Sequence, residues 1–249
     1  MTEFSYQLYS SRNHGPIGET LAMLKDCGYS AVEGFGGLYG ENIEGTKAAL
    51  AATGLKMRTG HFGLEDLEAD PAGVIETAKA LGMEMVIVPF IAPQDRPTDS
   101  AGWAAYGKRL DAAGGPVREA GLEFAYHNHE FEMLPTPTGD IPMALILEYA
   151  PNTAWECDVA WVAKGGADPV DWFARYRDRI TAVHLKDIAP EGEAMNEDGW
   201  ADLGHGVMNW PGLMEALRET KAKHLIMEHD LPSDDKRFAT RSIATAKGL

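Results

Sequence analysis

The chain has 249 residues and carries 22 Lys and Arg against 38 Asp and Glu, which gives a formal net charge of −16. Nucleic acids and anionic membranes are bound largely through Lys and Arg, so we expect neither as a partner of this chain. A hydrophobic content of 45% with 24% charged residues is typical of a globular protein. The length suits a single domain over residues 1–249.

The sequence shows no sign of export. Residues 1–11 lack the pattern of a signal peptide, and no window approaches the roughly 18 consecutive apolar residues of a membrane span. Cys27 and Cys157 are the only cysteines. Two thiols so far apart in sequence make neither a disulfide framework nor a thiolate metal site. We therefore expect a reduced, cytoplasmic protein.

Short apolar runs alternate with longer amphipathic runs along the whole chain. The apolar runs predict strands over residues 4–9, 31–35, 55–61, 85–90, 122–129, 153–158, 180–186 and 224–228. The amphipathic runs predict helices over about 17–27, 41–52, 70–82, 99–120, 141–149, 168–177, 211–221 and 233–246. Within the fourth of these helices, Gly114, Gly115 and Pro116 are expected to cause a break or a kink.

This alternation predicts parallel strands joined by helical crossovers, and therefore an α/β protein. Eight such units in about 250 residues match a (β/α)₈ barrel, or TIM barrel. A doubly wound open sheet is the alternative, but the Gly-rich phosphate turn that usually follows its first strand is absent. In a barrel, functional residues lie where the strands end at their carboxyl side.

Polar and ionisable residues stand at six of the eight predicted strand ends. The last four strands supply His127, His129, Asp158, His184 and Glu228 to one rim. Neutral His together with Asp and Glu forms a mixed nitrogen and oxygen shell, which suits Mn²⁺, Zn²⁺, Co²⁺ or Fe²⁺. A divalent cation would also relieve the repulsion between neighbouring carboxylates.

Because side chains alternate along a strand, residues two apart share a face. His127 and His129 form such a pair, as do Glu156 and Asp158. In each pair one member can reach the metal while the other contacts the substrate or orients a ligand. We expect Glu156 to orient a neighbour rather than to bind the metal.

Several motifs in order resemble the xylose isomerase-like barrels, a family that includes sugar phosphate isomerases and epimerases, inosose isomerases and dehydratases, and endonuclease IV. The resemblance spans nearly the whole chain and is most similar to the sugar phosphate isomerase/epimerase branch. The motifs that carry it are Tyr126–Glu132 (YHNHEFE), Glu156–Trp161 (ECDVAW), Gly165–Pro169 (GGADP), His184–Asp187 (HLKD), Leu203–Gly206 (LGHG) and Glu228–Asp230 (EHD).

The resemblance implies a divalent metal (Mn²⁺, Zn²⁺, Co²⁺ or Mg²⁺) held by residues of strands five to eight. Asp158, His184 and Glu228 match three of the family's four ligands. The family has Glu at the remaining position, where this chain has His127. Either His127 is the fourth ligand, or Glu132 folds back from the following loop to replace it. We favour His127 and assign Glu132 to the substrate or to proton transfer.

The resemblance also implies a sugar isomerase or epimerase of carbohydrate metabolism. We expect proton abstraction beside a carbonyl of a sugar, keto-sugar or cyclitol, with a metal-stabilised enediolate. Glu228, His129 or Glu132 would act as general base, and Lys186 would stabilise the oxyanion. Lys186 and Asp187 forming a plain ion pair is the structural alternative.

Further residues are expected around the substrate. His61 ends the third strand, and Trp161 would form an apolar wall of the pocket. Residues 188–209 form a long connection that we interpret as a lid, with His205 as a substrate contact. Gly204 and Gly206 are candidates for holding a phosphate, but the acidic surroundings favour an uncharged substrate.

Three other functions are alternatives. With one family Glu missing, a metal-dependent β-elimination becomes a strong competitor, as in an inosose-type dehydratase or a keto-glycoside lyase. A non-catalytic sugar-binding protein is a weaker one. A DNA-repair endonuclease is disfavoured, because the fourth strand ends at Pro89 and Phe90 rather than at a His ligand, and because the chain is acidic. A homo-oligomer is compatible with the sequence.

Overall fold

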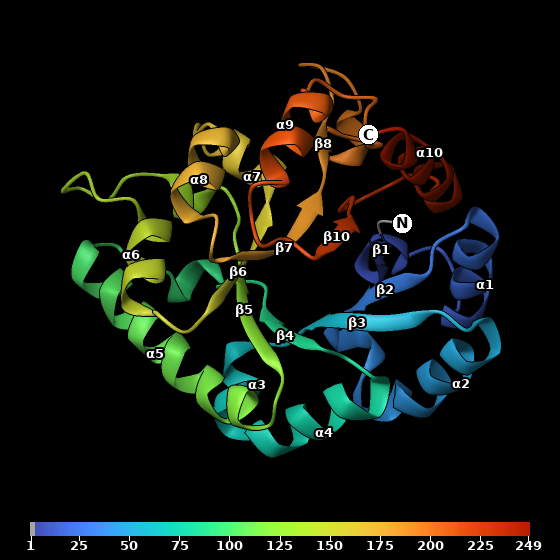
Figure 1. Cartoon of the computed structure of the whole chain (residues 1–249), viewed down its shortest axis with the longest axis horizontal. Coiled ribbons are helices and arrows are strands. Elements are labelled where there is room, and N and C mark those ends of the chain that lie inside the picture. Colours follow the sequence, from blue (N-terminus) through green and yellow to red (C-terminus); the bar gives the residue numbers. More distant parts are fainter. Residues whose placement is uncertain (1–2) are drawn as a thin grey trace.

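Eight parallel strands close into a barrel in the computed structural model, which describes residues 3–249. Neighbouring strands follow the order β1-β10-β7-β6-β5-β4-β3-β2, and helices surround them (Figure 1). The barrel strands are β1 (Phe4–Gln7), β2 (Ala31–Gly34), β3 (Lys56–His61), β4 (Met85–Val88), β5 (Glu123–His127), β6 (Ala154–Asp158), β7 (Ile180–Leu185) and β10 (His224–Met227). The predicted TIM barrel is confirmed.

Ten α-helices occur within the described residues. They are α1 (Ile17–Cys27), α2 (Ile43–Thr53), α3 (Leu64–Ala69), α4 (Pro71–Leu81), α5 (Ser100–Glu119), α6 (Pro142–Tyr149), α7 (Val159–Lys164), α8 (Pro169–Tyr176), α9 (Trp210–Leu217) and α10 (Asp235–Gly248). The short helices α3 and α7 were not expected from the sequence. Across residues 3–249, no helix combines the length and the apolar character that crossing a membrane requires.

Local sequence explains where α4 begins and ends. The Asp70 carboxylate caps the helix by accepting a hydrogen bond from Gly73 N at 2.9 Å, and Pro71 occupies the first turn. Gly82 ends the helix with φ of 77°, a left-handed conformation that costs glycine little. The predicted start at Asp70-Pro71 and the stop at Gly82 are therefore confirmed.

Of the break or kink expected in the fourth long helix, the break is wrong. α5 runs without interruption from Ser100 to Glu119, with Pro116 inside its last turns. Tertiary packing explains this outcome at Gly114, because a Cβ there would lie 2.2 Å from the ring of Phe124 on β5. The glycine thus allows α5 to approach the barrel closely, and this packing outweighs its weak helix propensity.

The connection after β7 is anchored by one buried carboxylate. β8 (Asp187–Ile188) pairs antiparallel with β9 (Trp200–Ala201). Asp187 Oδ2 accepts hydrogen bonds from Gly204 N at 2.8 Å, Gly206 N at 3.1 Å and Trp210 Nε1 at 2.9 Å. The alternative in which Asp187 forms an ion pair with Lys186 is therefore wrong. Asp187 instead fixes residues 188–210 to the end of β7.

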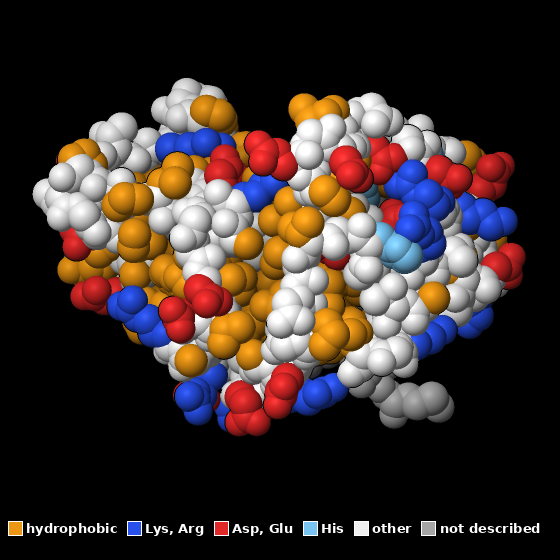
Figure 2. Space-filling model, turned by 90° about the horizontal axis from the view of Figure 1, so that it is seen from above, with side chains coloured by type: hydrophobic (Ala, Val, Ile, Leu, Met, Phe, Trp, Pro, Cys, Tyr) orange, Lys and Arg blue, Asp and Glu red, His pale blue; other side chains and the backbone are white. Residues whose placement is uncertain are grey.

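Acidic and basic side chains are interspersed around the margins of the face shown in Figure 2. Hydrophobic side chains lie between them on the same face. This face therefore carries no large patch of one charge.

We predict that Asp187→Asn destabilises the protein by roughly 3 kcal/mol, because an amide NH₂ would face backbone and indole N–H donors that are left without an acceptor. Urea denaturation monitored by circular dichroism measures the change. Asp198→Asn in the same connection is the control, since Asp198 is exposed, and it should cost less than about 0.5 kcal/mol. Equal stability of the two variants would contradict the anchoring role of Asp187.

Candidate metal centre and substrate pocket

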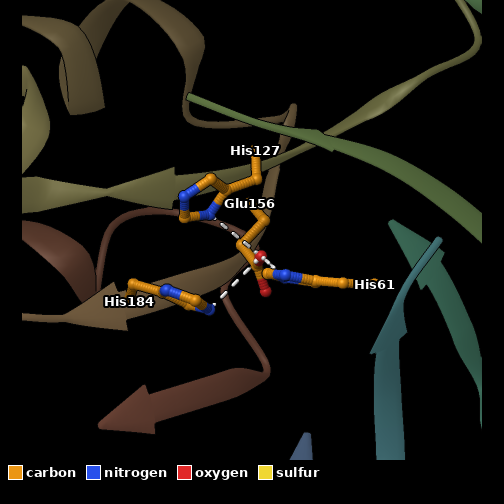
Figure 3. Close-up of side chains that lie close together, drawn as sticks. All are labelled: His61, His127, Glu156 and His184. Carbon is orange, nitrogen blue, oxygen red and sulfur yellow. Dashed lines mark hydrogen bonds and ion pairs between the residues drawn. The ribbon is translucent and has the colours of Figure 1, made fainter. Parts of the chain in front are cut away.

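Three imidazoles converge on the carboxylate of Glu156 inside the barrel (Figure 3). Glu156 Oε2 lies 2.8 Å from His61 Nε2, 3.1 Å from His127 Nδ1 and 3.3 Å from His184 Nε2. The four side chains come from β3, β5, β6 and β7, and all four are buried. We call His61, His127, Glu156 and His184 the Glu156 group. Their donor atoms are close enough together to hold a metal ion.

A second carboxylate, Glu33 on β2, faces two of the same imidazoles. Glu33 Oε1 lies 2.7 Å from His184 Nε2 and 3.2 Å from His61 Nε2. Gln7 at the end of β1 donates a hydrogen bond to the same oxygen at 2.7 Å. Burial disfavours a charged imidazole, but Glu33 and Glu156 outweigh it and raise the pKa of His61 to about 10.

His184 connects the Glu156 group to a second cluster nearer the strand ends. Its Nδ1 lies 2.9 Å from Glu228 Oε2 and 3.9 Å from Asp158 Oδ2. Together with His127 these residues form the Asp158 group (His127, Asp158, His184 and Glu228), whose donor atoms also lie within 4.8 Å of one another. This is the ligand set predicted from the sequence, and the structure brings all four residues together.

The donor chemistry of the Asp158 group fits a divalent ion. Two imidazoles and two carboxylates make the mixed shell that transition metals and Mn²⁺ accept. Asp158 Oδ2 is buried without a hydrogen-bond partner, which is costly unless a cation is supplied. Burial raises the pKa of Asp158 to about 7, whereas burial lowers the pKa of His127 to about 4 and so keeps that imidazole neutral.

Lys186 places a buried ammonium beside the Asp158 group. Its Nζ lies 2.5 Å from Asp230 Oδ2, 3.1 Å from Glu228 Oε2 and 3.7 Å from Asp158 Oδ2. Burial opposes the charged form, but these three carboxylates outweigh it and raise the pKa of Lys186 above its usual range. Lys186 therefore stays a cation, as stabilisation of an oxyanion requires.

Carboxyl groups outnumber cations in this part of the barrel. The carboxyl groups are Glu33, Glu156, Asp158, Glu228 and Asp230. Three of the neighbouring bases, Lys186, His61 and His184, have a raised pKa and can hold a charge. Burial raises the pKa of Asp158, whose closest cation is Lys186 at 3.7 Å, so its charge is less compensated than that of Asp230, which lies 2.5 Å from the same ammonium. A divalent cation beside Asp158 would supply the missing positive charge.

Asn128 sets the relative positions of the ends of β5 and β6. Its Oδ1 accepts hydrogen bonds from Trp155 Nε1 at 2.9 Å and from Asp158 N at 3.0 Å, and its Nδ2 donates to Asp158 O at 3.2 Å. Because side chains alternate along the chain, these hydrogen bonds, which hold Asn128 away from the pocket, direct its neighbours His127 and His129 toward the pocket. No role for Asn128 was expected from the sequence.

A cavity of about 420 Å³ opens above the two groups. Its lining includes the predicted residues His61, His127, His129, Trp161 and Glu228. Burial lowers the pKa of His129 well below its usual value, and His129 Nδ1 has no hydrogen-bond partner. The imidazole of His129 is thus neutral, which a general base requires, although its lowered pKa makes it a weak base.

Two predicted site residues lie elsewhere. Glu132 is buried away from the cavity, where its carboxylate accepts hydrogen bonds from Tyr126 Oη at 2.5 Å and from His129 N at 2.8 Å. It therefore does not fold back over the mouth as a ligand. His205 Nδ1 lies 2.6 Å from Arg241 Nη2, and His205 is not part of the cavity lining. It turns away because the backbone on both sides of it is bound to Asp187.

The expected lid also occupies a different place. None of residues 188–209 lines the cavity. The segment reaches the site through Trp200, whose ring packs edge-on against Trp161 at 4.6 Å and lies 4.3 Å from Lys186 Nζ. Trp200 thus supports the wall of the pocket from behind.

Sequence reasoning missed Glu33 and Gln7 as members of the site. Glu33 was visible at the end of an apolar strand, which is the same signal that identified Asp158 and His184. Its partners lie on strands far away in the sequence, so the spacing of residues carried no sign that Glu33 would face His184. Gln7 lay within a run that was interpreted only as a strand.

A model of the family described as xylose isomerase-like TIM barrel matches residues 21–245. Among curated relatives, a rhizopine catabolism protein (MocC) of Rhizobium meliloti is 25% identical over 244 residues, which covers 82% of this chain and 71% of that protein. An inosose dehydratase of Lacticaseibacillus casei is 25% identical over 130 residues, which covers 47% of this chain and 43% of that enzyme. The chain thus matches less than half the length of that dehydratase.

Solved structures show the same fold. A sugar phosphate isomerase/epimerase from Parabacteroides distasonis superposes with a TM-score of 0.83 at 20% identity and covers 100% of this chain and 94% of that one. The IOLI protein, solved with a bound zinc atom, superposes with a TM-score of 0.77 at 15% identity and covers 99% of this chain and 96% of that one. Identities this low support the fold and not the activity.

We predict that Glu156→Gln lowers the pKa of His61 by roughly 1 to 3 pH units, because the amide keeps a hydrogen-bond acceptor but removes a charge 2.8 Å from Nε2. A pH titration of the histidine ring resonances by NMR measures this change. Glu148→Gln on α6, an exposed position, is the control. A His61 pKa that stays near 10 in Glu156→Gln would show that Glu156 does not hold the proton on His61.

Proposed function

Because the chain belongs to the xylose isomerase-like TIM barrel family, we propose that it is a divalent-metal-dependent isomerase or epimerase of an uncharged sugar, keto-sugar or cyclitol. The observation that carries the proposal is the Asp158 group. It joins two imidazoles and two carboxylates at the bottom of a cavity, beside the buried ammonium of Lys186.

His127, Asp158, His184 and Glu228 would hold the ion. When bound, the ion supplies a Lewis acid that polarises a carbonyl oxygen. The second ring nitrogen of His184 supports this assignment, since Nε2 lies 2.7 Å from Glu33 Oε1 while Nδ1 faces Glu228. A carboxylate behind a ligating histidine fixes the orientation of its ring and strengthens it as a donor. Glu33 and Glu156 thus orient the histidines and leave ion binding to the Asp158 group.

The chain's own residues supply the proton transfer. Glu228 and His129 both line the cavity, and each can accept a proton from a carbon next to a carbonyl. Lys186 keeps its charge beside Glu228 and stabilises negative charge that develops on a substrate oxygen. Return of the proton to a neighbouring carbon gives isomerisation, and return to the opposite face gives epimerisation.

An uncharged substrate fits the surroundings best. Glu228 and Asp230 are the charged side chains along the described cavity lining, apart from the histidines. The Gly204 and Gly206 N–H groups, which were candidates for a phosphate, already donate to Asp187. A phosphorylated sugar would therefore meet carboxylates and find no free N–H donors at these glycines.

A β-elimination is the second candidate. Of the two residues that we assign to proton transfer, only Glu228 is a carboxylate, so a pair of opposed carboxylate bases is missing. One base and one Lewis acid suffice to expel a leaving group. Relatives named inosose dehydratase match part of the chain. Product analysis separates the candidates, because elimination releases water or an alcohol and isomerisation conserves mass.

We predict that the protein binds Mn²⁺ and that Asp158→Asn weakens this binding by more than about tenfold at pH 8. In the unsubstituted protein, affinity should fall at least tenfold per pH unit below about 7, because the ion must displace the proton from Asp158, whose pKa is raised to about 7, and also the proton of His184, whose pKa is raised. Isothermal titration calorimetry at several pH values tests both statements. The exposed Asp178→Asn is the control, and affinity independent of pH between 5 and 8 would contradict the assignment.

We predict that Glu228→Gln slows solvent-deuterium incorporation into the substrate by about 10²- to 10⁴-fold, because an amide cannot accept the carbon-bound proton. Proton NMR of a panel of keto-sugars in D₂O with Mn²⁺ measures the exchange. Glu215→Gln on α9, which is exposed, should exchange at the normal rate. Undiminished exchange in Glu228→Gln refutes the role of Glu228, while sugar binding without exchange in the unsubstituted protein favours a binding protein.

A further inference from the structure

The cavity has a polar bottom and an aromatic mouth. The buried side chains His61, His127 and Glu228 form its bottom. The rest of the lining is largely apolar and is contributed by Tyr9, Phe35, Phe62, Pro89, Phe90 and Trp161. Tyr9 and Phe90 are 38% and 45% exposed, so these two rings mark the opening to solvent. We call them the mouth rings.

The mouth rings face the cavity from different sides of the barrel. Tyr9 follows β1 and Phe90 follows β4, and in the closed barrel β2 and β3 lie between those two strands. A group that extends from the polar bottom toward solvent therefore has an exposed ring on either side of the barrel mouth. Large exposed apolar side chains that border a cavity commonly mark a binding surface.

Neighbouring side chains hold both mouth rings in place. The guanidinium of Arg12 lies 3.7 Å from the centre of the Tyr9 ring, and Phe35 meets that ring edge-on at 5.4 Å. The guanidinium of Arg96 lies 5.3 Å from the centre of the Phe90 ring, which meets His129 edge-on at 5.2 Å. Cation–π and edge-to-face contacts of this kind fix a ring without burying it.

The cavity is larger than its polar part needs. A volume of about 420 Å³ lies in the range of pockets that enclose drug-sized ligands, which exceed one hexose. A lone polyol that filled it would press hydroxyl groups against Phe35, Phe62 and Phe90, where no side chain offers a hydrogen bond. Hydroxyl groups that lose water without a partner weaken binding. The upper cavity therefore suits a ring that turns an apolar face to these side chains.

We propose that the mouth rings form a binding site for a second ring, so that the substrate is a glycoside whose sugar lies on the Asp158 group and whose attached ring stacks on Tyr9 and Phe90. This inference rests on the proposed function, because that function places the sugar at the polar bottom. The C–H face of a sugar ring and the face of an aryl ring share the required chemistry, since both stack on aromatic side chains.

The test compares methyl glycosides with phenyl glycosides and disaccharides of the same sugars, in the gluco, galacto and manno series. Isothermal titration calorimetry is carried out with the Mn²⁺-loaded protein. We expect at least one two-ring ligand to bind about tenfold more tightly than its methyl counterpart. Phe90→Ala and Tyr9→Ala should remove that advantage and leave the affinity for the methyl glycoside unchanged. Both positions are exposed, so the substitutions leave the core intact.

Leu134→Ala is the matched control, because Leu134 is 51% exposed and lies outside the cavity lining. A preference for the phenyl glycoside identifies the second ring as aryl, and a preference for the disaccharide identifies it as a sugar. The inference is overturned if no two-ring ligand binds more tightly than its methyl counterpart. It is also overturned if phenol alone binds as tightly as the phenyl glycoside.

The binding measurement requires no turnover, so it is independent of the proposed reaction. Stacking at the mouth rings without deuterium exchange on any keto-sugar would support the second-ring site and contradict the proposed isomerase activity. Exchange without a preference for a second ring would support the isomerase activity and contradict the second-ring site.

Discussion

The candidate site depends on the compensation of carboxylates that the barrel has removed from water. Parallel strands end at one rim, so each acidic strand end brings its charge into the same buried space. The protein compensates part of that charge internally, with Lys186 between Glu228 and Asp230 and with imidazoles around Glu156. Among the described residues Asp158 Oδ2 has no hydrogen-bond partner, and Lys186 lies 3.7 Å from it. The geometry thus leaves the position beside Asp158 able to accept a further cation.

His184 belongs to both the Glu156 group and the Asp158 group and connects them. Its two ring nitrogens face different carboxylates, Glu228 on one side and Glu33 on the other. An imidazole held from both sides has one orientation, which is what a metal ligand needs. Glu33 thereby connects β2, in the first quarter of the chain, to the candidate ligands on the last four barrel strands.

The fold and the grouping of His127, Asp158, His184 and Glu228 could be predicted from the sequence, because both follow from the alternation of strands and helices and from the residues at the strand ends. Asp158, His184 and Glu228 each come at the end of an apolar run, and the barrel brings such positions together whatever the loops do. Glu132 could not be placed, since it lies in a loop whose path is decided by a hydrogen bond to Tyr126. His205 was misplaced because Asp187 directs its loop. The break expected at Gly114 does not occur, because α5 packs closely on Phe124 and this packing offsets the weak helix propensity of glycine.

The anchoring of the connection after β7 has a consequence for how this protein can change. Asp187 holds the segment through the backbone N–H groups of Gly204 and Gly206. Gly204 has a φ of 78°, and a Cβ there would lie 2.4 Å from Thr245 Cγ2, so this position requires glycine. Gly206 itself is fixed, because a Cβ there would lie 2.2 Å from Ile188 O. Glu197 in the same connection is fixed separately, because its buried carboxylate accepts hydrogen bonds from Ser233 N and Arg237 Nη2. The exposed side chains of Glu191, Glu193, Met195 and Asn196 take no part in either anchor. These four positions can therefore accept substitutions and acquire new surface contacts while the residues around Lys186 keep their positions.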